Sequence, residues 1–325
     1  MRLLLTRGGV THDVTRLFLT CLWSGDKSAI SRQMTASLYC PQTRGLPVPQ
    51  LGDGWTLEEG GDILFAGTVL RRSQKSDSDT VELTAYDRGY WLAQNDATYR
   101  FAGASPETVT RTVCADLGVP VAGLPAASAS IRRKYAAVRA SALLTNVWSL
   151  ASEATGDSYS LRYTPSGLLV ERRAVSPDAP ALADEYNIID AVTTENAASV
   201  VDRVVIYDKN GNRLRTREDS GAQALYGVMA RHVTQADGKA AEANDKADAL
   251  LRDNAMQQSV TVNVLGDVSL VSGRTVTVRN RTPGLTGVFW IDGDQHEWKN
   301  GQHFTKLTLN VKNVMASATA GSDLK

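Results

Sequence analysis

The sequence has little cysteine and histidine, no excess of either charge and no long apolar run. Of its 325 residues, three are cysteine and four are histidine, and 35 Lys and Arg balance 35 Asp and Glu. Three widely spaced cysteines without a Cys-x-x-Cys pattern exclude a disulfide framework and indicate buried thiols in a protein made in a reducing cytosol. Zero net charge argues against a dedicated nucleic-acid-binding protein, because neutralising phosphates requires a surplus of basic residues. No segment approaches the roughly 18 apolar residues of a membrane-spanning helix.

Sequence signatures of common enzymes are also missing. The chain has no Gly-x-x-x-x-Gly-Lys-Ser/Thr phosphate loop, no Gly-x-Ser-x-Gly nucleophile turn and no His-Glu-x-x-His zinc pair. The residues therefore indicate no catalytic, cofactor-binding or metal-binding site. They favour a structural scaffold.

One polar cluster is open to two interpretations. Asp292, Asp294 and His296 alternate along the chain, and His303 follows a little later. Alternating residues of a strand share a face, so these carboxylates and imidazoles could bind a divalent metal across a hairpin. The preferred interpretation is an Asp-Gly turn followed by strand residues that face solvent, because a third firm ligand and an orienting second shell are missing.

A second group of residues keeps an enzymatic alternative open. Glu58 and Glu59 lie beside Gly60-Gly61, and paired acids are what a glycosidase would use. Adjacent acids in a loop are more often a solvated turn. A carbohydrate-binding module would need an exposed tryptophan. The six tryptophans are dispersed through the chain, and we interpret most of them as core or interface anchors: Trp23, Trp55, Trp91, Trp148, Trp290 and Trp298.

Three segments differ in their hydrophobic period. Residues 1–92 predict antiparallel strands, as in 80–86, where apolar and polar residues alternate with period two. Residues 93–187 predict a small α+β domain, with one helix from Ser105-Pro106 and another from Ser141 to Gly156. A hairpin is predicted around Pro165-Ser166-Gly167.

The third segment, residues 188–315, again predicts strands. Asn210-Gly211 is typical of a tight hairpin turn. An alanine-rich helix is expected at about 235–257, with a thin apolar seam that lies against a sheet or a neighbouring subunit. Residues 316–325 are small and polar, and we expect a mobile tail. The predicted fold class is mainly β with an α+β insertion.

Several stretches, in order along nearly the whole chain, resemble the baseplate hub family of contractile phage tails and phage-tail-like particles. The family includes the late control protein D group, prophage tail hubs and the N-terminal part of type VI secretion spikes. The matching stretches are Trp23-Ser24-Gly25-Asp26, Gly61-Asp62-Ile63-Leu64-Phe65-Ala66-Gly67-Thr68-Val69, Thr84-Ala85-Tyr86-Asp87 with Trp91-Leu92 and Asn95, Gly287-Val288-Phe289-Trp290-Ile291, His296-Glu297-Trp298, and Thr305-Lys306-Leu307-Thr308-Leu309.

The resemblance implies a non-enzymatic homotrimer. Each subunit of such a hub carries two related, tail-tube-like antiparallel β-barrels, here expected at 1–92 and 188–315, flanking the α+β domain. Three subunits then form a pseudo-six-fold ring that adapts the hexameric tail tube to the trimeric central spike. The resemblance also implies contacts with tape-measure and baseplate wedge proteins, assembly in the bacterial cytoplasm, no cofactor, no membrane insertion and no sequence-specific nucleic-acid binding. Any cell-wall hydrolase of the particle is expected on a separate polypeptide. The alternative function is that of a virion-associated cell-wall or polysaccharide hydrolase, and a third option is a tail-fibre or carbohydrate-binding module.

Overall fold

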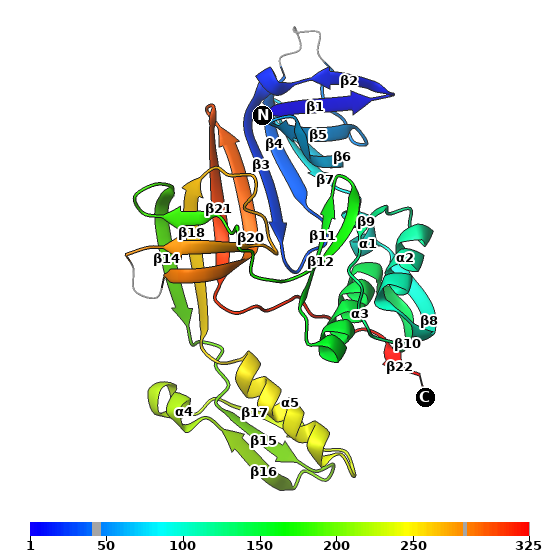
Figure 1. Cartoon of the computed structure of the whole chain (residues 1–325), viewed down its shortest axis with the longest axis vertical. Coiled ribbons are helices and arrows are strands. Elements are labelled where there is room, and N and C mark those ends of the chain that lie inside the picture. Colours follow the sequence, from blue (N-terminus) through cyan, green and yellow to red (C-terminus); the bar gives the residue numbers. More distant parts are fainter. Residues whose placement is uncertain (41–46, 282–284, 325) are drawn as a thin grey trace. The chain divides into compact units, whose positions relative to one another are not determined.

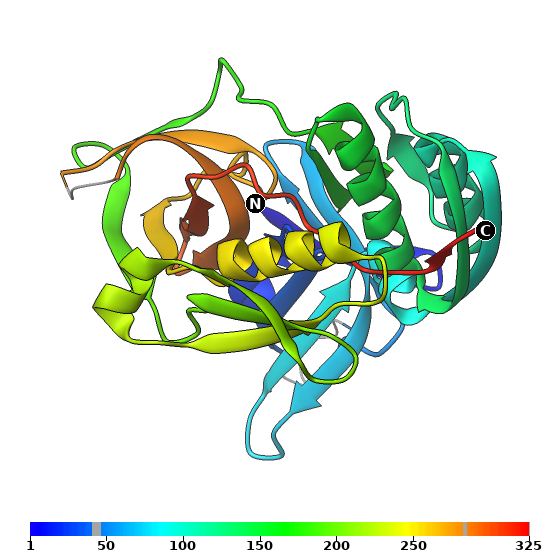
Figure 2. The same cartoon turned by 90° about the horizontal axis from the view of Figure 1, so that it is seen from below.

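The structure is a computed structural model that describes residues 1–40, 47–281 and 285–324 (Figure 1 and Figure 2). The chain separates into two compact units. The first comprises Met1–Ala191 with Thr261–Lys325, and the second comprises Val192–Val260. The second unit is therefore an insertion between two stretches of the first.

A large sheet contains strands from both ends of the chain. Its strand order is β14-β18-β21-β20-β3-β4-β7-β6-β5-β1-β2, with β19 beside β20 and β13 beside β19. The strands are β1 (Arg2–Arg7), β2 (Val10–Asp13), β3 (Phe18–Asp26), β4 (Gln33–Tyr39), β5 (Gly54–Glu59), β6 (Asp62–Gln74), β7 (Thr80–Tyr86), β13 (Ala181–Ala183), β14 (Ile188–Asn196), β18 (Gln257–Leu265), β19 (Thr275–Arg279), β20 (Thr286–Lys299) and β21 (Gln302–Asn310). The prediction of a mainly β protein is confirmed. Within the described residues this strand order does not close into a barrel.

Burial follows the alternation that predicted the strands. In β7, Val81, Leu83 and Ala85 are buried, whereas Glu82 is exposed. Strand β3 begins at Phe18, directly after Thr15–Leu17, which form a short 3-10 helix (η1). The N-terminal strands enclose an apolar core that also contains residues of the C-terminal part: Leu3, Leu5, Trp23, Met34, Leu38, Trp55, Leu57, Phe65, Val69, Val271 and Trp298 are among its members.

The three cysteines are free and buried, as predicted. Burial raises the pKa of Cys21 and of Cys114 to about 12. These thiols therefore pack as small apolar side chains and are unreactive near neutral pH.

The segment after β7 folds into helices and two small sheets, which we call the α+β module (residues 89–172). Its sheets have the orders β22-β10-β8 and β11-β12-β9. The elements are α1 (Gly89–Gln94), β8 (Asp96–Ala104), α2 (Pro106–Asp116), β9 (Val121–Gly123), β10 (Ile131–Arg139), α3 (Ala140–Thr155), β11 (Tyr159–Thr164) and β12 (Gly167–Arg172). Strand β22 (Ser322–Asp323) comes from the C-terminal segment.

The two predicted helices of the module, α2 and α3, begin close to the residues that the sequence indicates. The Ser105 hydroxyl accepts a hydrogen bond from the Thr108 backbone N–H (3.2 Å), and Pro106 is the first residue of α2. Helix α3 ends at Thr155 and is capped by Gly156, whose φ of +76° lies in the left-handed region. The hairpin predicted around Pro165-Ser166-Gly167 is formed by β11 and β12.

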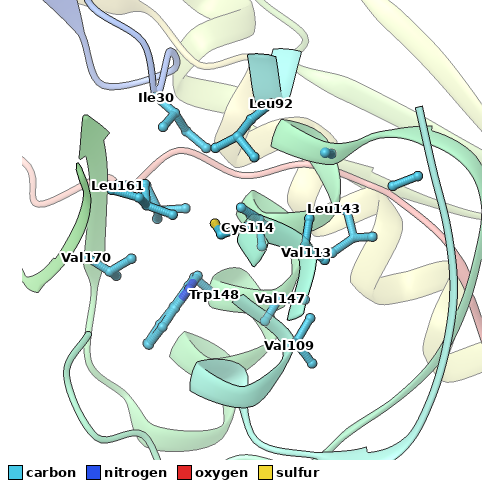
Figure 3. Packing of buried hydrophobic residues seen from close by; sticks show 14 of the residues in the cluster. Ile30, Leu92, Val109, Val113, Cys114, Leu143, Val147, Trp148, Leu161 and Val170 are labelled. Carbon is cyan, nitrogen blue, oxygen red and sulfur yellow. The ribbon is translucent and has the colours of Figure 1, made fainter. Parts of the chain in front are cut away.

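The core of the module lies between α2, α3 and the β11–β12 hairpin. Figure 3 shows Val109 and Val113 of α2 and Trp148 of α3 among the side chains that pack together there. The Trp148 indole N–H donates to the Thr110 hydroxyl (3.0 Å), so its polar atom is satisfied. Ile30, from the β3–β4 loop, also belongs to this cluster, which extends the core towards the large sheet.

The second unit is a three-stranded sheet with a helix on it. The strand order is β16-β15-β17, and the elements are β15 (Arg203–Tyr207), β16 (Arg213–Glu218), α4 (Ser220–Tyr226), β17 (Ala230–Thr234) and α5 (Ala240–Asp253). The predicted thin alanine seam of the helix packs on this sheet, where Ala243 and Ala247 are buried with Val204 and Ile206. The insertion is thus larger than the single helix expected at about 235–257, because the predicted hairpin strands form a separate sheet beneath it.

The C-terminal segment, expected to be a mobile tail over 316–325, is held near its end. Residues Ser322–Asp323 form β22, which pairs antiparallel with β10, and Ala320 is buried. Lys325 lies outside the described residues.

Candidate functional site

The first and last parts of the chain meet where β3 pairs with β20. The register places Trp23 opposite His296 and Cys21 opposite Trp298 (Figure 1). We call this place the β3–β20 seam. The paired strands come from opposite ends of the sequence, so the pairing is non-local. It makes one continuous sheet of two segments that were predicted as separate domains.

A buried ion pair lies at one end of the seam. Arg32 directly precedes β4, and its guanidinium faces Asp294 of β20. Its Nη1 lies 3.1 Å from Asp294 Oδ1, and its Nη2 makes a second, shorter contact with Oδ2. The Ser272 backbone N–H also donates to Oδ1 (2.6 Å). Burial alone would raise the pKa of Asp294, but the charge of Arg32 and the hydrogen bonds from His296 and Arg32 lower it to about 2.

Aromatic rings surround this ion pair. The Arg32 guanidinium lies 4.0 Å from the centre of the Trp23 ring, and the Trp23 and His296 rings are 4.9 Å apart. His296 Nε2 is 3.1 Å from the Leu270 carbonyl oxygen, and its Nδ1 is 3.2 Å from His303 Nε2. Burial, together with neighbouring His296, lowers the pKa of His303 to about 4. The imidazole of His303 is therefore neutral near pH 7.

The expectation that Asp294 and His296 face solvent from a turn is wrong. Strand β20 continues through Asp292-Gly293, and the side chains of Asp294 and His296 are fully buried. A turn would have been the local preference of Asp-Gly, but pairing with β3 on one side and β21 on the other extends the strand.

Asp292 does not join the histidine cluster. The register between β20 and β21 shifts between Ile291 and Gly293, so Asp292 is the extra residue of a β-bulge. Its carboxylate binds Lys27 Nζ (2.6 Å) and accepts from Asn310 Nδ2 (3.1 Å), and Arg173 Nη2 lies 3.8 Å away. The bulge thus separates Asp292 from Asp294. Within residues 1–40, 47–281 and 285–324, no group of three or more His, Cys, Asp and Glu residues is arranged to hold a metal ion.

The acids of the hydrolase alternative are engaged in ion pairs with the N-terminus. Glu58 binds Arg2 (3.0 Å), and Glu59 lies 2.6 Å from the amino group of Met1. Both acids therefore tie β5 to β1. A cavity of about 780 Å³ opens beside the seam, and its lining includes Ser24, Gly25, Gln33, Tyr86, Tyr90 and Lys306. Two acids at its wall already have partners: Asp26 accepts from Ser28, and Asp294 pairs with Arg32.

Most of the tryptophans are buried. Trp23, Trp55, Trp148, Trp290 and Trp298 are all at least 95% buried, which confirms their predicted role as core anchors. Trp91 is partly buried against the module core. No pattern in the sequence indicates a role for Arg32 or Arg173. The Arg173 side chain is buried and stacks 4.6 Å from the Trp290 ring. In the part of the chain that the structure describes, no helix is long and apolar enough to cross a membrane.

The histidine pair predicts a dependence of stability on pH. Because burial keeps the pKa of His303 below its value in the unfolded chain, the stability that neutral His303 contributes is complete above about pH 6.5 and is lost as the pH falls towards 4. We expect His303→Gln to remove about 2–3 kcal/mol of this acid-induced loss, measured by urea unfolding at pH 7, 5.5 and 4. Burial raises the pKa of Asp87 to about 7, so Asp87 changes stability with pH in the opposite direction. Both proteins contain Asp87, so its contribution cancels in the comparison. If the free energy of unfolding falls equally with decreasing pH in both proteins, the prediction is contradicted.

Comparison with known proteins fixes the family. The model of the YQBQ-like family matches residues 21–310. The chain belongs to the YQBQ-like family. It is 24% identical, over 274 residues, to the phage-like element PBSX protein XkdQ of Bacillus subtilis (strain 168), and the match covers 81% of this chain and 83% of XkdQ.

Solved structures share the fold of this YQBQ-like chain over most of its length. The 43 kDa tail protein of prophage MuSo2 from Shewanella oneidensis matches with a TM-score of 0.70 at 14% identity, covering 95% of this chain and 97% of that one. The E. coli c3393 protein, described as a type VI secretion component with structural similarity to the T4 phage tail proteins gp27 and gp5, matches with a TM-score of 0.51 at 12% identity, covering 95% and 76%. The resemblance to baseplate hub proteins that the motifs indicate is thereby confirmed.

Proposed function

We propose that this YQBQ-like chain is a structural, non-enzymatic hub of the baseplate of a contractile tail or tail-like injection particle. Three copies would form a ring with pseudo-six-fold symmetry that joins the hexameric tail tube to the trimeric central spike. The observation that carries the proposal is the fold shared, from end to end, with a prophage tail protein. Tape-measure and baseplate wedge proteins would be its other partners.

Two β parts in each subunit would give the ring its six-fold appearance. Residues 1–92 and 188–315 would supply two related, tube-like β parts per subunit, and residues 93–187 would form the α+β domain between them. In the ring, pairing between subunits would cover the free edges of the large sheet, which otherwise expose unpaired backbone groups. Three subunits with two β parts each then present six similar elements to the tube.

The β3–β20 seam suits a part that must stay intact while a tail contracts. Two remote segments are joined there by continuous strand pairing and by a buried, bidentate Arg32–Asp294 pair. Such an element resists separation because pulling the segments apart exposes a charge and several tryptophans. These contacts would hold the two segments together under mechanical load.

Copy number tests the proposed function. We expect native mass spectrometry of purified baseplates, or of the complex released from them, to give three copies of this chain per particle. A control is the tail tube protein of the same preparation, whose copies should occur in multiples of six. A single copy or six copies of this chain in an assembled tail would contradict the proposal.

A further inference from the structure

The last residues of the chain lie on a prepared surface of the α+β module. The Asn146 side chain, 93% buried on α3, donates from Nδ2 to the Ala318 carbonyl oxygen (2.8 Å) and accepts from the Tyr135 hydroxyl (2.9 Å). The Leu324 backbone N–H donates to the Arg132 carbonyl oxygen (3.2 Å). In both views the red C-terminal segment leaves β21 and ends beside β10 (Figure 1 and Figure 2).

This surface selects for small residues. Gly321 has a φ of +69°, and a Cβ added to it would lie 2.7 Å from the Lys134 carbonyl oxygen. Ala320 before it is buried. A side chain larger than alanine at 320, or any side chain at 321, would therefore push the segment off β10.

The surface also recognises charge and backbone. Arg133 donates from Nη2 to the Gly321 carbonyl oxygen (3.2 Å) and lies 3.0 Å, through Nη1, from the Asp323 carboxylate. Strand β22 adds to the edge of β10, with Arg133 opposite Asp323 and Lys134 opposite Ser322. These are the elements of peptide recognition by strand addition: backbone pairing, a pocket that admits only small residues, and one charged anchor.

The connection to this docked segment is built loosely. Residues 311–321 form neither helix nor strand, and Val311 and Val314 are 58% and 44% exposed. Besides the docked residues, Asn313 accepts from Arg173 Nε (2.8 Å), and Met315 packs partly against the module core. A segment with so few contacts opens locally, without unfolding of the strands on either side.

We propose that residues 318–324 form a detachable latch and that the surface holding them is a peptide-docking site. Its occupant is the C-terminal segment of this chain, either the chain's own or the same sequence supplied as a peptide. Closed, the latch ties the end of β21, and hence the large sheet, to the edge of β10. The proposal does not depend on the hub function.

The test uses the full chain with Gly321→Val and a labelled peptide of residues 314–325. In the variant the latch cannot close, because the new side chain meets the Lys134 carbonyl, but the docking surface itself is unchanged. We expect the peptide, followed by fluorescence anisotropy, to bind the variant at least tenfold more tightly than the parent, whose site is occupied. A peptide carrying the same Gly321→Val change should not bind. Equal affinity for both proteins, or binding to neither, overturns the proposal.

A second measurement checks that the latch is open in Gly321→Val. Hydrogen exchange of residues 313–324, resolved by peptide, should be at least tenfold faster in Gly321→Val than in the parent. Ser317→Val, at an exposed position of the connecting segment, is the matched control and should leave exchange unchanged. Unchanged exchange in Gly321→Val would show that the contact at Gly321 does not hold the segment, and would also overturn the proposal.

Discussion

Replacing Arg32 by alanine is expected to lower the free energy of unfolding by about 3–5 kcal/mol, because it leaves the buried carboxylate of Asp294 without its counter-charge. The Asp294 side chain is fully buried, and its remaining partners are the Ser272 N–H and His296. The loss also removes the guanidinium that stacks on Trp23. Urea unfolding of the purified chain at pH 7 measures this difference.

Two further variants separate the charge from the loss of side-chain volume. Arg32→Met with Asp294→Asn removes both charges of the pair, and the Asn carbonyl can still accept from Ser272, so we expect a smaller loss than for Arg32→Ala alone. Lys209→Ala, which breaks a largely exposed pair with Asp237, should change stability by no more than about 1 kcal/mol. If Arg32→Ala costs no more than Lys209→Ala, the ion pair does not hold the seam.

Trp148→Ala is expected to cost about 3–5 kcal/mol, because it empties the centre of the α+β module. The Trp148 side chain is fully buried, lies 4.9 Å from the Tyr159 ring and donates to Thr110. Truncation therefore leaves a cavity and also removes the donor to the Thr110 hydroxyl, which keeps its own hydrogen bond to the Pro106 carbonyl oxygen. The expected result is a lower midpoint of urea unfolding, with hydrogen exchange accelerated most in α2 and α3.

Tyr186→Ala provides the matched control. Tyr186 is an aromatic residue of similar bulk that is 81% exposed, and its truncation should change stability by less than about 0.5 kcal/mol. A similar loss in both variants would mean that the module core does not depend on Trp148. Faster exchange in β3 and β20 than in α2 and α3 would likewise contradict the account, because it would place the damage outside the module.

Local signals in the sequence predicted the elements that local interactions decide. Period-two alternation located β7, and Ser105-Pro106 located the start of α2, because a strand face and a helix cap each depend on neighbouring residues. The helix of the second unit was expected over too long a span. Its true start at Ala240 follows Gly238, which has a φ of +70°.

Contacts between remote segments could not be predicted in the same way. Nothing near Arg32 in the sequence indicates that its partner is Asp294, and Asp292-Gly293 has the local preference of a turn although strands on both sides extend it. The small, polar C-terminal residues were expected to be mobile because nothing local holds them. They are ordered by contacts with the remote Asn146 and with β10. The motif Thr84-Ala85-Tyr86-Asp87 gave a partial signal, because Asp87 accepts from the Arg32 backbone N–H (2.8 Å).

The most direct test of the account is a reconstruction of the assembled baseplate by electron cryo-microscopy. We predict a ring of three copies on the tail axis, between the last tube ring and the spike, in which residues 1–92 and 188–315 of each copy take alternate, nearly equivalent places around the lumen. A chain found away from the axis, or two β parts in unrelated positions, would contradict the central claim.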